Sequence, residues 1–408
     1  MLEPDYYPVI TQANSYLRAS VRRLHLIAGL LVGPFILVAA LTGFFYAFAP
    51  TAEQVVYHDA YVAQTPGTSR PLSEQTAVAQ REHPDLKVSA VQVKDGANTR
   101  VLFKDESLPS KSYRQAVFVD PVSLEVKDQF IQYGSSNASP LRTWLSRGHK
   151  DLWLGEPGRI YSELAASWLG ALAIAGLYLM LTQRVKQKRM SVRRHSQLGA
   201  WLFPGLLFLT VTGLTWSLVA GENIGKVRKM LNWMSPTPPS QSEMVPFDQT
   251  LAVAREQGLT GMLELSSTGV ARESRGPFRF AIDQVIVGPD GQLVGRIDFE
   301  QWPLAAKLTN WLIELHMGIL FGIWSEIALG LLAAGIIVIT VLGYVAWFRS
   351  ARKGLPKPVR FQPVLAVLLV IYAVFAPLFG ISLLAFVLID VLLQLSRRRA
   401  KTKEAVNA

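Results

Sequence analysis

The sequence predicts an α-helical integral membrane protein built as a tandem duplication of one unit, in which a small α+β module connects two membrane helices. Three observations predict this fold. Half of the 408 residues are hydrophobic, several apolar runs reach the roughly 20 residues that a membrane-spanning helix needs, and residue identities recur at fixed offsets along the chain. The chain has no cysteine, which excludes disulfides, thiolate metal sites, iron–sulfur clusters and covalent haem attachment.

Four apolar runs are predicted to span the membrane, and a fifth run is predicted to form a hairpin within it. The four spans are residues 24–49, 160–182, 195–219 and 316–348. The fifth run, residues 363–396, is too long for one untilted span and is interrupted at Ala376-Pro377. We therefore expect two short helices that turn at Pro377, and one long helix is the alternative.

Basic residues predict the orientation of these spans. They cluster in four segments: 1–23, 183–194, 349–362 and 397–408. Such clusters mark the cytoplasmic side of a membrane protein, so both termini are expected in the cytoplasm, and the membrane is expected to be the inner membrane of a bacterium. The net charge of +11 is explained by these flanks, which contact membrane lipid, and it does not indicate a nucleic-acid partner.

Two long segments, residues 50–159 and 220–315, are then left on the periplasmic side. Each has a helical stretch followed by runs of alternating apolar and polar residues, a pattern that is typical of strands. The turn Gly288-Pro289-Asp290-Gly291 separates two such runs and predicts a hairpin. We interpret both segments as small α+β modules.

The internal repeat is the most specific signal in the sequence. Around the first and third spans, matching residues lie 170 positions apart: His25/His195, Gly29/Gly199, Pro34/Pro204, Thr42/Thr212 and Gly43/Gly213. Before the second and fourth spans the offset is 167: Leu141/Leu308, Trp144/Trp311, Leu145/Leu312, His149/His316 and Gly155/Gly322. Parallel repeats of this kind are related by an axis along the membrane normal. Equivalent residues are therefore expected at the same depth, where they can face each other.

Four of the six histidines belong to this repeat and form two pairs. His25 and His195 lie at the cytoplasmic starts of their spans, and His149 and His316 lie near the outer starts of theirs. A haem on the repeat axis can be held by one imidazole from each side, and histidine ligands without cysteine describe a non-covalent b-type haem. The pattern predicts two haem b groups, with these four histidines as the axial ligands of the iron.

Other interpretations of the histidines remain open. A single histidine at a helix end is more often an interfacial or capping residue than a ligand, whereas two pairs at matched depths favour ligands. A copper or zinc site would recruit a third or fourth donor, and Met317 is the only obvious extra donor nearby. His58 and His83 have no repeat partner and are expected to be ordinary surface residues.

Further residues fit a haem pocket. Gly29 and Gly199 remove side chains where a macrocycle or a neighbouring helix must approach closely. Trp144 and Trp311 are expected either to stack on the outer haem or to belong to the interfacial aromatic belt. Four arginines beside the inner histidines are candidates for pairing with haem propionates, although the positive-inside rule explains them equally well: Arg22, Arg23, Arg193 and Arg194.

Several of these motifs resemble PepSY-associated transmembrane proteins. They are Arg22-Arg23-Leu24-His25 with Gly29, Gly155-Glu156-Pro157-Gly158-Arg159 after His149, and L-H-M-G-I-L-F-G over residues 315–322. The third span departs slightly, because Arg193-Arg194-His195 has no residue between the arginine pair and the histidine. The resemblance covers nearly the whole chain. It implies PepSY-like periplasmic modules, haem binding by the four matched histidines, and a relation to iron-regulated inner-membrane proteins, some of which are siderophore reductases.

Together these observations predict a haem-dependent membrane oxidoreductase. Electrons are expected to enter at the inner haem from a cytoplasmic donor, either a flavoprotein, a reduced carrier or quinol. They then pass to the outer haem and reduce a periplasmic ferric chelate, for which a ferric siderophore is favoured. One alternative is a membrane-anchored PepSY-type binding or regulatory protein without redox activity. A transporter is a second alternative, but the spans offer few polar residues near mid-membrane: Ser167, Thr210 and Thr340.

Overall fold

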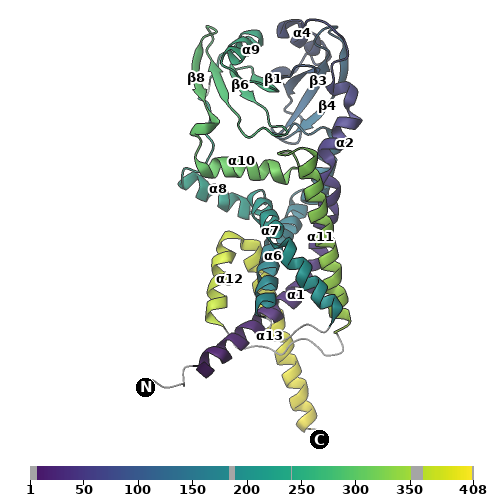
Figure 1. Ribbon diagram of the computed structural model, residues 1–408, viewed down its shortest axis with the longest axis vertical. Coiled ribbons are helices and arrows are strands. Elements are labelled where there is room, and N and C mark those ends of the chain that lie inside the picture. Colours follow the sequence, from purple (N-terminus) through teal and green to yellow (C-terminus); the bar gives the residue numbers. More distant parts are fainter. Residues whose placement is uncertain (1–6, 183–188, 240, 351–361, 407–408) are drawn as a thin grey trace. The chain divides into compact units, whose positions relative to one another are not determined.

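The computed structural model describes residues 7–182, 189–239, 241–350 and 362–406, and these residues divide into two compact units (Figure 1). The first, here called the helical unit, comprises the chain up to Thr42, His149–Arg228, and the chain from Leu332. The second, the sheet unit, comprises Gly43–Gly148 and Lys229–Leu331. Much of the predicted cytoplasmic loops 183–194 and 349–362 lies outside the described residues.

Four helices in the described part of the chain are long and apolar enough to cross a membrane. They are α1 (Tyr7–Ala47), α6 (Glu156–Leu181), α7 (Met190–Thr215) and α11 (Ile323–Phe348). Small residues let α6 and α7 approach closely, since a Cβ at Gly170 would lie 2.7 Å from the Thr210 methyl group. Close backbone approach of this kind is the usual basis of helix association in lipid, where burial of apolar surface supplies no driving force between helices.

The C-terminal apolar run forms two helices, α12 (Pro363–Phe375) and α13 (Pro377–Val406), which meet at the buried Ala376. Trp168 of α6 is fully buried against Phe379 of α13, with 4.5 Å between the ring centroids. Its indole N–H donates to Ser382 Oγ at 2.9 Å. The Tyr372 hydroxyl of α12 donates to the Ser167 carbonyl at 2.7 Å. Ring packing and two hydrogen bonds therefore attach both helices to α6.

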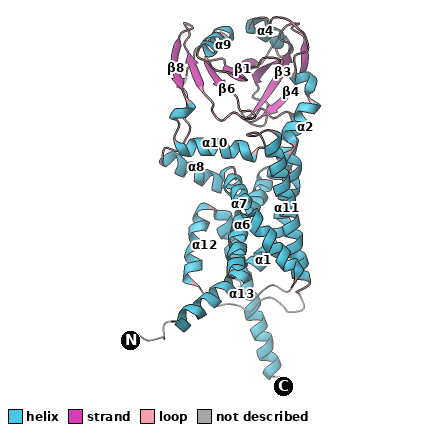
Figure 2. Cartoon of the chain, in the orientation of Figure 1, coloured by secondary structure: helices cyan, strands magenta, loops and turns pink. Residues whose placement is uncertain are grey.

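The strands of the two predicted modules form one antiparallel sheet in the order β4-β3-β2-β1-β5-β6-β7-β8 (Figure 2). The first four are β1 (Lys87–Val93), β2 (Thr99–Lys104), β3 (Tyr113–Val119) and β4 (Val126–Tyr133). The last four are β5 (Leu263–Ser266), β6 (Val270–Glu273), β7 (Gln284–Val287) and β8 (Leu293–Ile297). The sequence analysis treated the two segments as separate modules. Pairing of β1 with β5 merges their sheets, because each strand would otherwise be an open edge with unsatisfied backbone groups.

One face of this sheet carries the main apolar core of the sheet unit. Two helices cover it, α4 (Leu72–Glu82) and α9 (Phe247–Glu256). Strand residues from both halves of the sheet meet there, including Val101, Phe103, Leu265 and Val285. The two helices are also joined directly, because the Asp248 carboxylate of α9 accepts hydrogen bonds from the first backbone N–H groups of α4, Leu72 N at 2.6 Å and Ser73 N at 3.0 Å.

Polar groups cross the β1–β5 seam on the opposite face. Arg114 on β3 contacts Glu264 on β5, with Nη1 3.2 Å from Oε1, and Gln92 on β1 donates to the same carboxylate at 2.5 Å. Burial by itself raises the pKa of Glu264, but Arg114 and Gln92 outweigh it and hold the pKa below its usual value. Glu264 is therefore the shared acceptor that links the two halves of the sheet.

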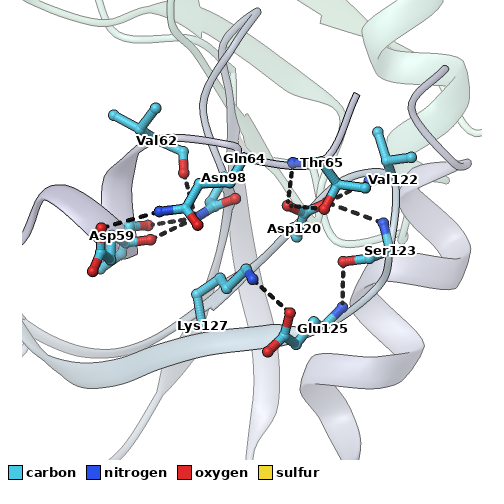
Figure 3. A network of polar contacts seen from close by, with 11 residues as sticks. Asp59, Val62, Gln64, Thr65, Asn98, Asp120, Val122, Ser123, Glu125 and Lys127 are labelled. Carbon is cyan, nitrogen blue, oxygen red and sulfur yellow. Dashed lines mark hydrogen bonds and ion pairs between the residues drawn. The ribbon is translucent and has the colours of Figure 1, made fainter. Parts of the chain in front are cut away.

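The rest of the sheet unit consists of short helices and tight turns. The helices are α2 (Ala49–Val56), α3 (His58–Tyr61), α5 (Pro140–Asp151), the 3-10 turn η2 (Phe299–Gln301) and α10 (Leu304–His316), of which α5 ends in the helical unit. α8 (Ala220–Met230) belongs mainly to the helical unit, and only its last two residues lie in the sheet unit. Figure 3 shows the turn between β3 and β4. There the Asp120 carboxylate accepts hydrogen bonds from the backbone of Val122, Ser123 and Thr65. These bonds outweigh the opposing effect of burial and hold the pKa of Asp120 well below its usual range.

Replacing Glu264 tests the seam. Glu264→Ala leaves Arg114 without its carboxylate, and we expect the sheet unit to lose about 1–3 kcal/mol of stability, less than for a fully buried pair, because the two side chains are 22% and 17% exposed. Hydrogen–deuterium exchange should rise in β1 and β5 before the outer strands. Glu256→Ala on α9 is the control, and equal exchange in the two variants would contradict this role of Glu264.

Candidate functional site

The structure brings together the two histidines predicted for the inner site. His25 comes from α1 and His195 from α7, and both side chains are half-buried in the helical unit. Their ring centroids are 6.1 Å apart and the ring planes are nearly perpendicular, at 72°. Residues that are 170 positions apart in the chain therefore form a contact pair.

A backbone carbonyl and a glycine of α11 contact the His195 ring and position it. Its Nδ1 donates to the Ile339 carbonyl at 2.8 Å. Gly343, one helical turn later, packs against the same ring, and a Cβ there would lie 3.4 Å from His195 Cε1. In a helix the side chain at i+4 lies beside the carbonyl of residue i, so glycine leaves the imidazole room to reach that carbonyl. A proton on Nδ1 leaves Nε2 with the lone pair that can bind a metal.

α6 presents the same arrangement to His25. A Cβ at Gly176 would lie 3.2 Å from His25 Cε1. The Leu172 carbonyl is the backbone hydrogen-bond acceptor near this ring. The match is incomplete, because His25 Nδ1 is buried and has no hydrogen bond of ordinary geometry among the described residues. Leu172 and Gly176 nevertheless stand 167 positions before Ile339 and Gly343, which is the offset of the repeat.

These two glycines are not among the residues predicted from the sequence. The predicted offset of 167 positions covers only the outer starts of the second and fourth spans and not the spans themselves. Extending the offset into the spans pairs Gly176 with Gly343. The signal was therefore present, but its meaning depends on which helix faces each histidine, and the tertiary structure decides that.

The arrangement fits two axial ligands of a haem. Two imidazoles that bind one iron along a common axis, with metal–nitrogen bonds of about 2 Å, have centroids roughly 6 Å apart, close to the 6.1 Å seen here. Gly29 and Gly199, one turn after each histidine, would have no described atom beyond the local helix backbone within 4 Å of an added Cβ, so the space beside both rings is open. In the described residues, no three His, Cys, Asp or Glu side chains gather as a metal site.

The four arginines near the inner pair differ in their surroundings. Arg23 forms an ion pair with Asp390 of α13 and is largely buried, with 13% of its side chain exposed. Arg22, Arg193 and Arg194 are exposed. The carboxylate of α13 therefore lies beside Arg23, which corresponds to Arg193 at the offset of 170 positions. The predicted contacts with haem propionates stay predictions for all four.

The two outer histidines belong to different units, so their pairing stays a prediction. His149 lies in the helical unit, where its Nδ1 is 3.3 Å from Thr42 Oγ1. Burial lowers the pKa of His149, which keeps the imidazole neutral and able to act as a ligand. His316 is the last residue of α10 in the sheet unit.

The two predicted tryptophans have different environments within the sheet unit. Trp144 on α5 is exposed. Trp311 on α10 donates its indole N–H to the Phe280 carbonyl at 2.8 Å and packs against Phe299, with 5.8 Å between the centroids. Trp311 therefore fixes α10 to the loop around Phe280. Stacking of either indole on a haem stays a prediction.

A buried polar cluster fixes the other side of α10, before His316. Glu314 is fully buried, and its Oε1 accepts a hydrogen bond from Asn310 Nδ2 at 2.6 Å and lies 3.5 Å from Arg275 Nε. Arg275 Nη2 also donates to Asn310 Oδ1 at 2.9 Å. Burial raises the pKa of Glu314 to about 7, against the opposing effects of Arg275 and Asn310. Charge and hydrogen bonding therefore hold the end of α10 that carries the histidine.

Four apolar helices, a sheet unit of strands and helices, and the repeat-matched histidines define a multi-pass membrane protein with a candidate site inside its helices. Residues 22–350 match the family model described as the PepSY-associated TM region, and the chain belongs to that family. The helices α12 and α13 lie after the matched stretch. No curated protein matches the chain. Among solved structures, one similar chain is a protein described as a lipoprotein from Clostridium difficile 630, with 7% identity, a TM-score of 0.23, and coverage of 57% of this chain and 95% of that chain.

The raised pKa of Glu314 predicts a pH dependence of stability. The pKa of a glutamate in an unfolded chain is about 4.3, whereas the pKa of Glu314 is raised to about 7 in the folded protein. Between these values the folded state binds more protons, so the stability should fall as pH rises from about 4.3 to about 7 and then level off. Glu314→Gln should flatten this slope in thermal unfolding of detergent-solubilised protein. Glu300→Gln, on the exposed turn η2, is the control, and an unchanged slope in Glu314→Gln would refute the assignment.

Proposed function

We propose that this chain is a di-haem b transmembrane electron-transfer protein of the bacterial inner membrane. In this proposal, electrons enter on the cytoplasmic side from a flavoprotein, a reduced carrier or quinol. They leave to a periplasmic ferric chelate, for which we favour a ferric siderophore. Both chain termini are placed in the cytoplasm, as the basic clusters indicate.

The observation that carries the proposal is the paired inner histidines with their repeat-matched supports. Two imidazoles at a separation suited to one iron, each beside a glycine and a carbonyl at equivalent positions of the two halves, are difficult to explain by helix packing alone. Packing would favour apolar side chains at these positions in a membrane. A ligand role explains why both halves of the chain have a ring and a glycine at the same place.

The residues of the chain have separate tasks in this proposal. His25 and His195 would hold the group, and the Ile339 carbonyl keeps the His195 proton on Nδ1, which would leave Nε2 available as a ligand. The surrounding apolar helices exclude water from the pair. Haem, when bound, supplies one-electron oxidation and reduction. His149 and His316 would hold the second haem near the outer side, from which a periplasmic acceptor can be reached.

A ferric siderophore is a chemically reasonable acceptor for such a conduit. Ferric iron is bound tightly by the hard oxygen donors of these chelators, and one-electron reduction to ferrous iron weakens that binding. The electron is all that the reaction requires from the protein, so the sheet unit would only have to position the chelate. This step needs no acid or base residue, which agrees with the absence of a carboxylate among the proposed ligands.

The regulatory alternative also has a structural observation in its favour. The sheet unit has a cavity of about 430 Å³ beside the β1–β5 seam, lined by residues that include Lys104, Arg114 and Glu264. A mixed-charge cavity of this size suits a small peptide or zwitterion. An anchored binding protein would use this cavity and would need no haem.

An absorption spectrum separates the two functions. The purified detergent-solubilised protein should show reduced b-type bands after dithionite, with about two haems per chain in a pyridine haemochrome assay. Reoxidation by a ferric siderophore should then be faster than by the iron-free chelator. A colourless protein from haem-replete cells would reject the conduit and favour the regulator.

Histidine variants test the pairing. His25→Ala and His195→Ala should each remove the same haem, and His149→Ala and His316→Ala should each remove the other, because a b-type haem held by two axial ligands is released when one is lost. The remaining haem should keep its spectrum and midpoint potential. Loss of both haems from every variant, or of neither, would contradict the pairing.

Glycine variants test the support of the inner rings. Gly176→Leu and Gly343→Leu place a side chain where the His25 or His195 ring lies, so each should remove the inner haem and leave the outer one. Ile174→Leu and Val341→Leu are matched controls, since these exposed residues lie on the same two helices and correspond in the repeat. Normal haem content in both glycine variants would show that the glycines do not position the rings.

A further inference from the structure

The loop at residues 276–280 of the sheet unit presents aromatic side chains that no described residue covers. Phe278 is 60% exposed and Phe280 is 45% exposed. Both rings contact Phe321, with centroids 6.1 and 5.8 Å away. Phe278 also has a positive φ of 58°, a left-handed backbone that a bulky L residue rarely adopts. The fold therefore maintains an unfavourable backbone that keeps a phenyl ring outside the core.

Hydrogen bonds attach this loop to the start of a membrane span. Phe278 N donates to the Leu320 carbonyl at 2.8 Å, and α11 begins three residues later at Ile323. On the other side, the Phe280 carbonyl accepts the Trp311 indole N–H from α10. The loop is therefore held between α10 and the segment that leads into α11, all within the sheet unit.

The length of α11 lets its ends extend beyond the hydrocarbon core. Its 26 residues extend about 39 Å at about 1.5 Å per residue, whereas the hydrocarbon core is about 30 Å thick. Trp324, in the first turn, is 67% exposed, as expected of a residue in the aromatic belt. A loop bonded to Leu320 lies at nearly the same depth.

The charges around the loop also suit lipid. Residues 318–324 have no charged side chain. Arg279, the only charged residue between Gly276 and Phe280, is bound to Glu273, with Nη1 2.7 Å from Oε1. The exposed face is thus apolar and aromatic without a free ionic group, a composition that favours the headgroup region over bulk water.

We propose that Phe278 and Phe280, together with Phe321 and Trp324, form an aromatic wedge that inserts into the outer leaflet at the headgroup level and ties the sheet unit to the membrane surface. The partner is the lipid interface itself. Insertion also holds α10 through Trp311, and so restrains the helix that ends at His316. The inference does not depend on haem, so it can stand or fall separately from the proposed function.

The absence of cysteine permits a test by site-directed spin labelling. The full chain is reconstituted in vesicles of phosphatidylethanolamine and phosphatidylglycerol, with a nitroxide at Gly276→Cys. An added Cβ at Gly276 meets no described atom within 4 Å, and Phe278 stays in place. Ile327→Cys on α11 is the lipid reference and Leu293→Cys on β8 is the water reference, because both side chains are exposed. Electron paramagnetic resonance then compares collisions with oxygen, which concentrates in lipid, and with a water-soluble nickel complex.

Insertion predicts an oxygen-to-nickel collision ratio at residue 276 several-fold above that at residue 293 and below that at residue 327. Adding Phe278→Ser should lower the ratio at 276 to the water reference, and Phe278→Leu should largely retain it. A water-like ratio at 276 with Phe278 present would overturn the proposal. Shielding from both reagents would also overturn it, since protein rather than lipid would then cover the wedge. An unchanged ratio in Phe278→Ser would overturn the role of that residue.

Discussion

An imidazole inside an apolar helix bundle has two nitrogens, and a ligand role requires the protein to satisfy one while the other stays available. The helical unit solves this for His195 with a backbone carbonyl, that of Ile339, rather than with a carboxylate. A carbonyl fixes the tautomer without adding a charge, which would be costly in lipid. Gly343 packs against the same ring, since a Cβ there would lie 3.4 Å from His195 Cε1, so a side chain larger than a methyl group at this position would meet the imidazole.

The groups around the inner histidines come from both halves of the chain. One helix from each half brings a histidine, and the second helix of the same half brings the glycine and the carbonyl. Each half therefore supports its own ring, while the histidine pair exists only when the halves meet. The halves also meet in the sheet unit, where β1 pairs with β5 and Glu264 joins Gln92 and Arg114. Both the histidine pair and the sheet thus require residues from both halves of the chain.

The C-terminal helices break this equivalence. Trp168, whose indole attaches α13 to α6, corresponds in the repeat to Gly335, which offers no indole. The added helices therefore pack on the first half of the chain, and they bring Asp390 to Arg23. The two inner histidines thus occupy matching positions in the two halves, whereas the Asp390 carboxylate lies beside the arginine of the first half.

The sequence by itself determined the membrane class, the four long helices and the histidines of the candidate inner site. These features follow from hydrophobic run length and from identities at fixed offsets, both of which are local or periodic and need no coordinates. It also located the break at Ala376-Pro377, because proline cannot continue the preceding hydrogen-bond pattern. The family assignment rests on motifs of the same local kind.

Only the tertiary structure decided which groups support those histidines and how the modules combine. Gly176, Gly343 and the Ile339 carbonyl matter because of the helix they face, and a facing helix cannot be inferred from composition. The merger of two modules into one sheet depends on β1 and β5 meeting as edges, and the cluster of Glu264 with Arg114 depends on strand register. Such contacts join residues far apart in the chain, so their energies are set by packing geometry rather than by any local pattern.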